Sequence, residues 1–338
     1  MKVIIPQSAF VRKNNLVREG LRHVLTAIPS HKQGTKKDIL MLSSRRSGST
    51  WLMESMGAEP GLRTLNEPFG PKYAGRSILA SIPEFKGIES GHRLYAFPES
   101  MLPIVDQYMS APSYTRLASA YNPLAPGYHF KTNRTLWKVI HANPAIEYFY
   151  KRAQEFHTFM LLRHPCPTIL SMERKYEPEL DLILSNDAFC SEHLDSAQLN
   201  FLQDLLKNGS RLDHFAAEWA LEQLVPIRKL PKYRSDIHVL SYEALRLDID
   251  KGIGFLAEYC ALEAPDKIIL ATNTPSASTA DERLKTVQDS DQSGFIAGWR
   301  KRMDTKTEQH IFSILHKLGI DYYEFGRDLP TPDYHTEF

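Results

Sequence analysis

Residues 39–52 run Ile39-Leu40-Met41-Leu42-Ser43-Ser44-Arg45-Arg46-Ser47-Gly48-Ser49-Thr50-Trp51-Leu52. The four apolar residues predict a buried strand, and the small hydroxyl residues with glycine predict a tight turn. A helix is expected to begin at Thr50. In such a strand, turn and helix, backbone N–H groups and the helix N-terminus can face a phosphate. The stretch therefore predicts an anion-binding loop.

The composition is that of a globular protein without a general affinity for nucleic acid. The chain has 338 residues, of which 42% are hydrophobic, with 41 basic and 40 acidic side chains. A protein that binds nucleic acid carries a clear basic excess, so nucleic acid is excluded as the partner. Three cysteines, Cys166, Cys190 and Cys260, are far apart and odd in number, which matches neither a disulfide framework nor a zinc site. This usage predicts a reducing, cytoplasmic compartment.

Residues 1–37 differ from the rest of the chain in charge. They hold eight Lys or Arg against one acid, a net charge of +7, while residues 38–338 sum to −6. Apolar residues recur at helical spacing from Leu16 to Ile28, and Pro29 ends the pattern. The alternatives are a transit peptide and a membrane-surface helix. However, the segment is poor in serine, and it has no apolar run long enough for a signal peptide or a membrane-spanning helix. We expect a helix that packs on the domain with a solvated basic face.

After the loop, apolar runs of strand length alternate with helical stretches. Strands are expected at residues 135–140, 158–162 and 237–240. Helices are expected at residues 145–155, from about 167, and at 212–229, 249–259 and 306–318. This alternation predicts an α/β fold in three layers, with a central parallel sheet flanked by helices. Ligands of such sheets bind at the carboxyl ends of the strands, where the loop also lies.

Two segments outside this alternation bear on the substrate. Residues 91–130 are rich in Pro, Tyr and Phe and predict an insertion that walls an acceptor pocket. Residues 176–195 hold six acids and no Lys or Arg, which predicts a solvated acidic loop. If that loop faces the pocket, its charge favours a neutral or cationic acceptor.

The loop differs from the P-loop of nucleotide triphosphatases, which requires Gly-x-x-x-x-Gly-Lys-Ser/Thr. Here the first glycine is missing, no lysine follows Gly48, and the basic residue Arg46 precedes it. This arrangement resembles the 5′-phosphosulfate loop of sulfotransferases that use 3′-phosphoadenosine-5′-phosphosulfate (PAPS), with the pattern Lys/Arg-Ser-Gly-Ser/Thr-Ser/Thr. The resemblance implies that the donor is bound by Arg45, Arg46, Ser47, Gly48, Ser49, Thr50 and Trp51. For Trp51, stacking on adenine and a place in the core are both open.

The same family holds the 3′-phosphate of the donor with an arginine at a strand end and a serine on the following helix. Arg163 follows the strand at 158–162, and Ser171 lies eight residues further on, as in the family. A guanidinium is a forked, permanently charged donor to phosphate, and the serine adds a hydroxyl. His164 stands where the family has aspartate, which is expected to weaken local hydrogen bonding. The alternative is an arginine that merely caps a surface turn.

Two further matches extend the resemblance to about residues 38–318. Residues 237–245 are similar to the family's Arg-Tyr-Glu-Asp-Leu strand end, and residues 296–301 to its C-terminal Trp-Arg/Lys segment. The resemblance places Tyr242 near the donor and brings Arg300 or Lys301 toward the 3′-phosphate, while Trp299 suits the core equally well. It implies one sulfotransferase domain of P-loop NTPase-like fold at 38–325, between the segment 1–37 and a tail at 326–338.

Sulfonate transfer needs a base for the acceptor and positive charge on the leaving group. Glu67, before Pro68, resembles the Glu-Pro step of the carbohydrate branch, in which a glutamate is the base. His141 competes, because cytosolic members carry Lys-Thr-His at this strand end. Lys138 and His141 are three residues apart, so alternation along a strand points them to opposite faces unless the strand ends before His141. This favours Glu67 as the base, with Lys138 on the sulfonate, Arg46 on the bridging oxygen, and His141 as an orienter or bystander.

The resemblance implies an enzyme that transfers a sulfonate group in line from PAPS to a small-molecule or sugar acceptor. The acceptor atom is a hydroxyl, with an amine as the alternative, and the product is 3′,5′-adenosine bisphosphate (PAP). No metal and no transmembrane segment are expected, and a homodimer is left open. Two other hypotheses remain. One is a P-loop nucleotide kinase, which predicts magnesium-dependent ATP binding, and the other is a non-catalytic nucleotide-binding protein on the same fold.

Overall fold

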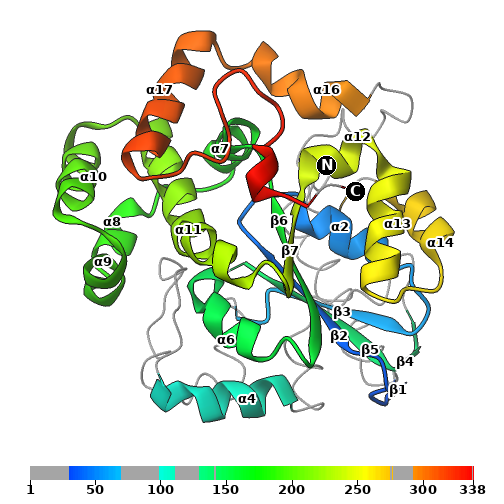
Figure 1. Ribbon diagram of the computed structural model, residues 1–338. Coiled ribbons are helices and arrows are strands. Elements are labelled where there is room, and N and C mark those ends of the chain that lie inside the picture. Colours follow the sequence, from blue (N-terminus) through cyan, green and yellow to red (C-terminus); the bar gives the residue numbers. More distant parts are fainter. Residues whose placement is uncertain are drawn as a thin grey trace, which may run out of the picture.

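A five-stranded parallel sheet lies at the centre of the molecule (Figure 1). In this computed structural model, the described residues are 30–69, 99–110, 129–140, 142–274, 276, 292–336 and 338. The strand order is β3-β5-β2-β6-β7. Their bounds are β2 (Asp38–Ser43), β3 (Leu62–Asn66), β5 (Arg134–Val139), β6 (Phe156–Leu162) and β7 (Ile237–Ser241). A separate small sheet pairs β1 (Ser30–His31) with β4 (Lys131–Thr132). The predicted parallel sheet is confirmed.

The central strand β2 is buried on both faces of the sheet. Leu40 and Leu42 contribute to one core cluster, whereas Ile39 and Met41 contribute to the other. This division follows from the two-residue period of a strand, in which successive side chains point to opposite faces. Since all four side chains are fully buried, each stabilises the fold by about 1.5–3 kcal/mol. A continuous apolar run is therefore what the middle position of the sheet requires.

Helices cover both faces of the sheet and complete the three layers (Figure 1). Residues of one core cluster come from α4 (Leu102–Ser110), α6 (Ile146–Lys151), α7 (Pro165–Glu173), α8 (Leu180–Leu184), α9 (Asp187–His193), α10 (Ser196–Asn208), α11 (Arg211–Tyr233) and α17 (Thr305–Lys317). Residues of the other come from α2 (Ser49–Met56), α12 (Tyr242–Leu247), α13 (Ile249–Tyr259) and α14 (Pro265–Thr272). The remaining elements are α16 (Gln292–Ala297) and the short helices η3 (Glu99–Met101), η4 (Asn143–Ala145), η5 (Gly298–Lys301) and η6 (Pro332–Tyr334). The predicted three-layer α/β architecture is thus confirmed.

The acidic segment 176–195 is not the loop that the sequence predicts. It contains α8 and α9, and Leu180, Ile183 and Phe189 within it are buried in the core. Apolar residues three positions apart share one face of a helix, so Leu180 and Ile183 can pack inward while Asp181 between them faces solvent. The prediction was wrong because the six acids masked this short apolar pattern.

Several predicted segments lie outside the described residues. These are the helix expected in residues 1–37, of which 1–29 are not described, and most of the insertion at 91–130. The tail is described in part, and Thr336 donates its backbone N–H to the carbonyl of Val239 in β7 at 2.6 Å. All three cysteines are free and buried. Among the described residues, no helix is both long enough and apolar enough to cross a membrane.

Candidate donor-binding and catalytic site

The loop between β2 and α2 has the backbone geometry of an anion site. β2 ends at Ser43, and α2 begins at Ser49, one residue before the predicted start at Thr50. Gly48 is the N-cap of α2 with a φ of 87°, a left-handed conformation that glycine adopts without strain. A Cβ at position 48 would overlap Cδ2 and Cε2 of the Tyr242 ring. Glycine therefore serves both the turn and the close approach of Tyr242.

We expect Gly48→Ala to lower the free energy of unfolding by about 2 kcal/mol or more, because a left-handed residue with a Cβ is strained and the Tyr242 ring must move. Chemical denaturation measures the change. The matched control is Gly254→Ala in α13, where a Cβ meets no atom within 4 Å. That substitution should stabilise the helix by about 0.5–1 kcal/mol. Equal effects of the two substitutions would contradict this account.

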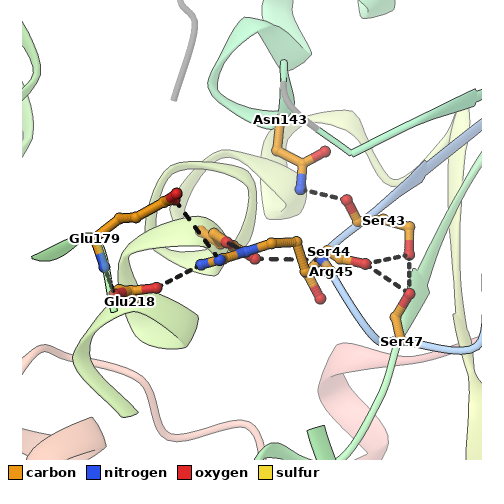
Figure 2. Close-up of polar contacts among 8 residues, drawn as sticks. Ser43, Ser44, Arg45, Ser47, Asn143, Glu179 and Glu218 are labelled. Carbon is orange, nitrogen blue, oxygen red and sulfur yellow. Dashed lines mark hydrogen bonds and ion pairs between the residues drawn. The ribbon is translucent and has the colours of Figure 1, made fainter. Parts of the chain in front are cut away.

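The hydroxyls of Ser43 and Ser47 form hydrogen bonds within the loop. Ser47 donates its hydroxyl to the carbonyl of Ser44 at 2.8 Å and also bonds to the hydroxyl of Ser43 (Figure 2). Asn143 of η4 donates its side-chain N–H to the carbonyl of Ser43 at 2.8 Å. These contacts fix the end of β2 and the turn that follows it. The donor contact predicted for Ser47 stays a prediction, and it would involve the backbone N–H more readily than this engaged hydroxyl.

Arg45 is directed into the protein rather than toward a ligand. Its side chain is 3% exposed and donates to Glu222 and, at 2.7 Å, to Glu218, both on α11 (Figure 2). Glu179 lies 4.0 Å from the same guanidinium. Burial acts to lower the pKa of Arg45, but Glu222 and Glu218 overcome it and raise that pKa. Because breaking such a buried pair costs about 3–5 kcal/mol, we assign Arg45 to holding the loop, in place of the donor contact expected from the sequence.

Arg46 connects the loop to the predicted 3′-phosphate residues. Its Nε donates to the hydroxyl of Ser171 at 2.8 Å, and Arg163 donates to the carbonyl of Arg46 at 2.9 Å. Arg46 has a φ of 59°, a left-handed conformation that is strained for a residue with a side chain and often occurs at functional sites. The structure therefore brings together all three residues that the sequence assigned to the two phosphates.

Tyr242 and Trp51 form the wall beside this group. The Arg163 guanidinium lies over the Tyr242 ring at 4.5 Å, and Tyr242 packs edge-on against Trp51 at 5.5 Å between ring centroids. Trp51 is buried, its indole N–H donates to the carbonyl of Thr272 at 3.0 Å, and the Arg246 guanidinium covers its ring at 4.9 Å. Tyr242 thus lies beside Gly48 of the loop, and its place near the donor stays a prediction. Trp51 is a core residue here, and its stacking on adenine stays a prediction.

Lys138 and Glu67 meet at the start of α2. The ammonium group of Lys138 donates to Thr50 Oγ1 at 3.0 Å, Asn66 Oδ1 at 2.6 Å and Glu67 Oε1 at 3.0 Å. Lys138 lies opposite Met41 of β2 and Asn66 of β3, so neighbouring strands supply its surroundings. Burial lowers the pKa of Lys138, and Glu67 opposes that effect. The predicted base and the predicted sulfonate ligand therefore form one ion pair.

The backbone at Glu67 is also unusual. Its φ is 56°, and its N–H donates to the carbonyl of Lys138 at 2.8 Å. The Glu67 side chain is 29% exposed, whereas that of Lys138 is 2% exposed. A strained backbone, together with a partly exposed carboxylate that is paired with a buried cation, is typical of a functional position. Asn66 was not predicted, and its place directly before Glu67 was the available signal.

The argument that separated Glu67 from His141 has changed. Strand alternation set Lys138 and His141 on opposite faces only if the strand continued to His141, but β5 ends at Val139. His141 itself lies outside the described residues. The preference for Glu67 now depends on its contact with Lys138, and the role of His141 stays a prediction.

His164 is the N-cap residue of α7, at the position where the family has aspartate. Its Nδ1 accepts the backbone N–H of Cys166 at 3.2 Å, and its Nε2 bonds to the carbonyl of Arg327 at 3.0 Å. Burial lowers the pKa of His164 to about 3, so the ring is neutral and Nε2 carries the proton. Glu243 accepts the His164 backbone N–H at 2.9 Å. The expected weakening of local hydrogen bonding is therefore compensated at this position.

The basic residues of the C-terminal match are Arg300 and Lys301. Arg300 pairs with Asp328 and, at 3.5 Å, with Glu308, and its guanidinium lies 4.3 Å from the centre of the Trp299 ring. Trp299 is buried and stacks on His164, so it belongs to the core. Lys301 is exposed. These contacts hold Arg300 against carboxylates, and the 3′-phosphate roles of Arg300 and Lys301 stay predictions without support from the structure.

Arg163 lies close enough to Arg46 and to Arg246 to influence the charge of each. Burial lowers the pKa of Arg46, with Arg163 and Arg174 acting in the same direction and Tyr176 opposing them. Burial also lowers the pKa of Arg246, with Arg163 again adding to the effect. Such a gathering of like charges favours a bound anion. Among the described residues, no group of His, Cys, Asp and Glu could hold a metal ion.

Comparison with known proteins gives similarity in structure only. No family model matches the chain, and no curated protein matches it in sequence. Mouse sulfotransferase SULT7A1 complexed with PAP is 14% identical over 88% of each chain, with a TM-score of 0.41. The sulfotransferase domain of the Synechococcus PCC 7002 olefin synthase is 17% identical over 87% of this chain and 98% of that one, with a TM-score of 0.41. The sulfotransferase domain from the curacin biosynthetic pathway is 15% identical over 85% of this chain and 99% of that one, with a TM-score of 0.43.

These neighbours are all sulfotransferases, the family that the loop and the Arg163 and Ser171 spacing resemble. Similarities with TM-scores this low carry no argument about activity or about site residues. The contacts of the loop, of Arg163 and of Lys138 must carry that argument.

Proposed function

We propose that this chain transfers a sulfonate group from PAPS to a hydroxyl of a small-molecule or sugar acceptor, in line and with PAP as the product. One observation carries the proposal: residues 46–50 contact both predicted groups of the site. Arg46 bonds to Ser171, beside Arg163, and Thr50 accepts a hydrogen bond from Lys138. The loop thus connects the residues proposed to bind phosphate with the ion pair of Lys138 and Glu67. This arrangement suits a donor that has a phosphate at one end and a transferable sulfonate at the other.

The residues present fit a nucleotide with phosphates at both ends. Arg163 has a buried Nε with no hydrogen-bond partner among the described residues, so it can still donate to an anion. Gly48 caps the N-terminus of α2, and a helix N-terminus favours a bound phosphate. No lysine follows Gly48 to contact the terminal phosphates of ATP. The composition of the site therefore supports a bisphosphate nucleotide over a triphosphate.

The chain's own residues divide the work of the transfer. The donor supplies an activated sulfonate whose leaving group is a nucleotide phosphate. Glu67, the more exposed member of the ion pair, is the proposed base and accepts the proton of the acceptor hydroxyl as the hydroxyl oxygen bonds to sulfur. Lys138 holds a buried positive charge at the same point, and Arg46 holds one on the phosphate side, so charge on the bridging oxygen is stabilised as the bond to sulfur breaks.

Calorimetry with three ligands tests the proposal. We expect metal-free binding of PAP that is tighter than binding of ADP, with or without magnesium. Arg163→Ala should weaken PAP binding about a hundredfold, because charge-assisted bonds to a phosphate are lost. The matched control is Arg234→Ala, an exposed arginine that precedes β7 and so lies at the amino ends of the strands, away from the carboxyl ends where Arg163 lies.

A preference for ADP with magnesium would contradict the proposal and support a nucleotide kinase instead. Tight PAP binding without any transfer of labelled sulfate from PAPS to a metabolite extract would support a non-catalytic nucleotide-binding protein. The same transfer experiment identifies the acceptor, since the labelled product can be isolated.

A further inference from the structure

The two residues that follow Glu67 are held by α4. Pro68 and Phe69 are both buried. The hydroxyl of Tyr108 on α4 donates a hydrogen bond to the carbonyl of Pro68, and the Phe69 ring packs against the Tyr108 ring with 5.6 Å between centroids. Phe69 also packs against Phe149 of α6, with 6.2 Å between centroids. One tyrosine therefore contacts both residues that come directly after the proposed base.

The backbone of Glu67 needs support of this kind. Its φ of 56° lies in the left-handed region, whereas a residue before proline favours an extended backbone. Such strain persists only where the surroundings enforce it. The N–H of Glu67 donates to the carbonyl of Lys138 at 2.8 Å, and the bond from Tyr108 fixes the carbonyl of Pro68. The strained residue is thus held at its own N–H and at the carbonyl of the next residue.

α4 is anchored to the protein by contacts other than the bond to Pro68. Asp106 of α4 accepts hydrogen bonds from Tyr148 at 2.6 Å and from Arg152 at 3.0 Å. Tyr148 belongs to α6 and Arg152 is the C-cap of that helix, and Figure 1 shows α4 and α6 side by side. Residues two apart do not share a helix face, so Asp106 and Tyr108 act on different sides of α4. The tyrosine therefore acts from a helix that is fixed to the core.

The competing explanation for the bond is a purely structural one. Tyr108 is fully buried, and a buried hydroxyl is expected to have a hydrogen-bond partner wherever it lies. The position of its partner favours a role in the transfer. A shift of the Pro68 peptide would move the Glu67 backbone, and with it the carboxylate that lies 3.0 Å from Lys138. Misplacement of a catalytic group by about 1 Å can lower a rate about a hundredfold.

We propose that Tyr108 is a positioning residue for the base. Through the carbonyl of Pro68, it keeps the Glu67 backbone left-handed and the Glu67 carboxylate against Lys138. This inference rests on the proposed function. It gives α4 a role in the transfer itself, although α4 lies within the segment 91–130 that the sequence predicted as a wall of the acceptor pocket.

The test measures transfer of labelled sulfate from PAPS to the metabolite extract at saturating PAPS. Tyr108→Phe removes the hydroxyl and keeps the ring against Phe69. The rate should fall about tenfold, the size of effect that one hydrogen bond usually contributes, while PAP affinity should stay within about twofold. In the Glu67→Gln background, the same substitution should change the remaining rate less than about twofold, because no base is left to position.

Tyr148→Phe is the matched control. It removes a buried hydroxyl that also holds α4, in this case through Asp106. The midpoint of thermal unfolding should fall about as much as in Tyr108→Phe, because each variant loses one buried hydrogen bond of the same helix. The rate of transfer should change less than about twofold.

Three results would overturn the inference and leave the proposed function in place. Equal losses of rate in the two tyrosine variants would assign the bond to folding alone. A tenfold loss that persists in the Glu67→Gln background would show that Tyr108 acts independently of the base. An unchanged rate in Tyr108→Phe, with a strong loss in Glu67→Gln, would show that the base needs no such support. A wild-type protein that transfers no sulfate from PAPS would overturn the proposed function as well.

Discussion

Glu67→Gln is expected to lower turnover about a thousandfold, the size of effect that a general base usually contributes. The glutamine keeps the shape of the side chain and can still contact Lys138, but it cannot accept the proton of the acceptor. PAP affinity should stay within about twofold, because the Arg46, Ser171 and Arg163 contacts do not include Glu67. Steady-state turnover with calorimetry on the same preparation separates the two effects.

Glu54→Gln is the matched control for this substitution. Glu54 lies on α2, and its charge also acts on Lys138, so it reproduces the loss of a nearby negative charge without removing the base. We expect a change in turnover of less than about tenfold. His141→Ala must be measured alongside. If that variant is inactive while Glu67→Gln retains turnover, the histidine is the base and our assignment is wrong.

Lys138→Met should lower turnover between about a hundredfold and a thousandfold, as the loss of one preorganised charge at a reacting oxygen usually does. Methionine fills a similar volume, so the loss is one of charge rather than of packing. PAP affinity should change little, because PAP has no sulfonate. Turnover of the wild type should also fall as the pH rises, and the fall should begin at a lower pH than the ordinary pKa of lysine. Burial lowers the pKa of Lys138, so its charge is lost earlier in the alkaline range.

Combining the two substitutions tests whether Lys138 and Glu67 act as a unit. They are 3.0 Å apart, so their effects should be far from additive. The double variant should lose little more turnover than the worse single variant. Fully multiplied losses would mean that the two groups act independently, and a large drop in the thermal midpoint of Lys138→Met would mean that its effect is on folding.

The parts of the fold that could be predicted are those with a strong local pattern. β2 has four consecutive apolar residues and lies in the middle of the sheet, so its sequence alone shows its position. β3 was not predicted, because only Leu62 and Leu65 of its five residues are buried, which is not the two-residue period of a strand. β7 is also an edge strand but is buried at four of its five positions, and its apolar residues were recognisable.

Contacts within the site were predictable where the residues lie on neighbouring segments of the fold. Arg163 and Ser171 lie on consecutive elements, and Glu67 follows the strand beside Lys138, so sequence spacing carries over into contact. Which arginine of the loop faces a ligand was not predictable in this way, because it depends on carboxylates of α11. A signal was present, since Glu218 and Glu222 are four residues apart on an otherwise apolar helix face and two buried acids require a cation.

The ion pairs of Arg45 make the loop inseparable from this particular helix. Transplanted to another parallel sheet without Glu218 and Glu222, the same residues would bury a guanidinium with no partner and fail to adopt this turn. In descent from a common ancestor, positions 45, 218 and 222 should accordingly be inherited or replaced together, even though 45 is adjacent to the proposed donor-binding residues and the other two are remote from them in the chain.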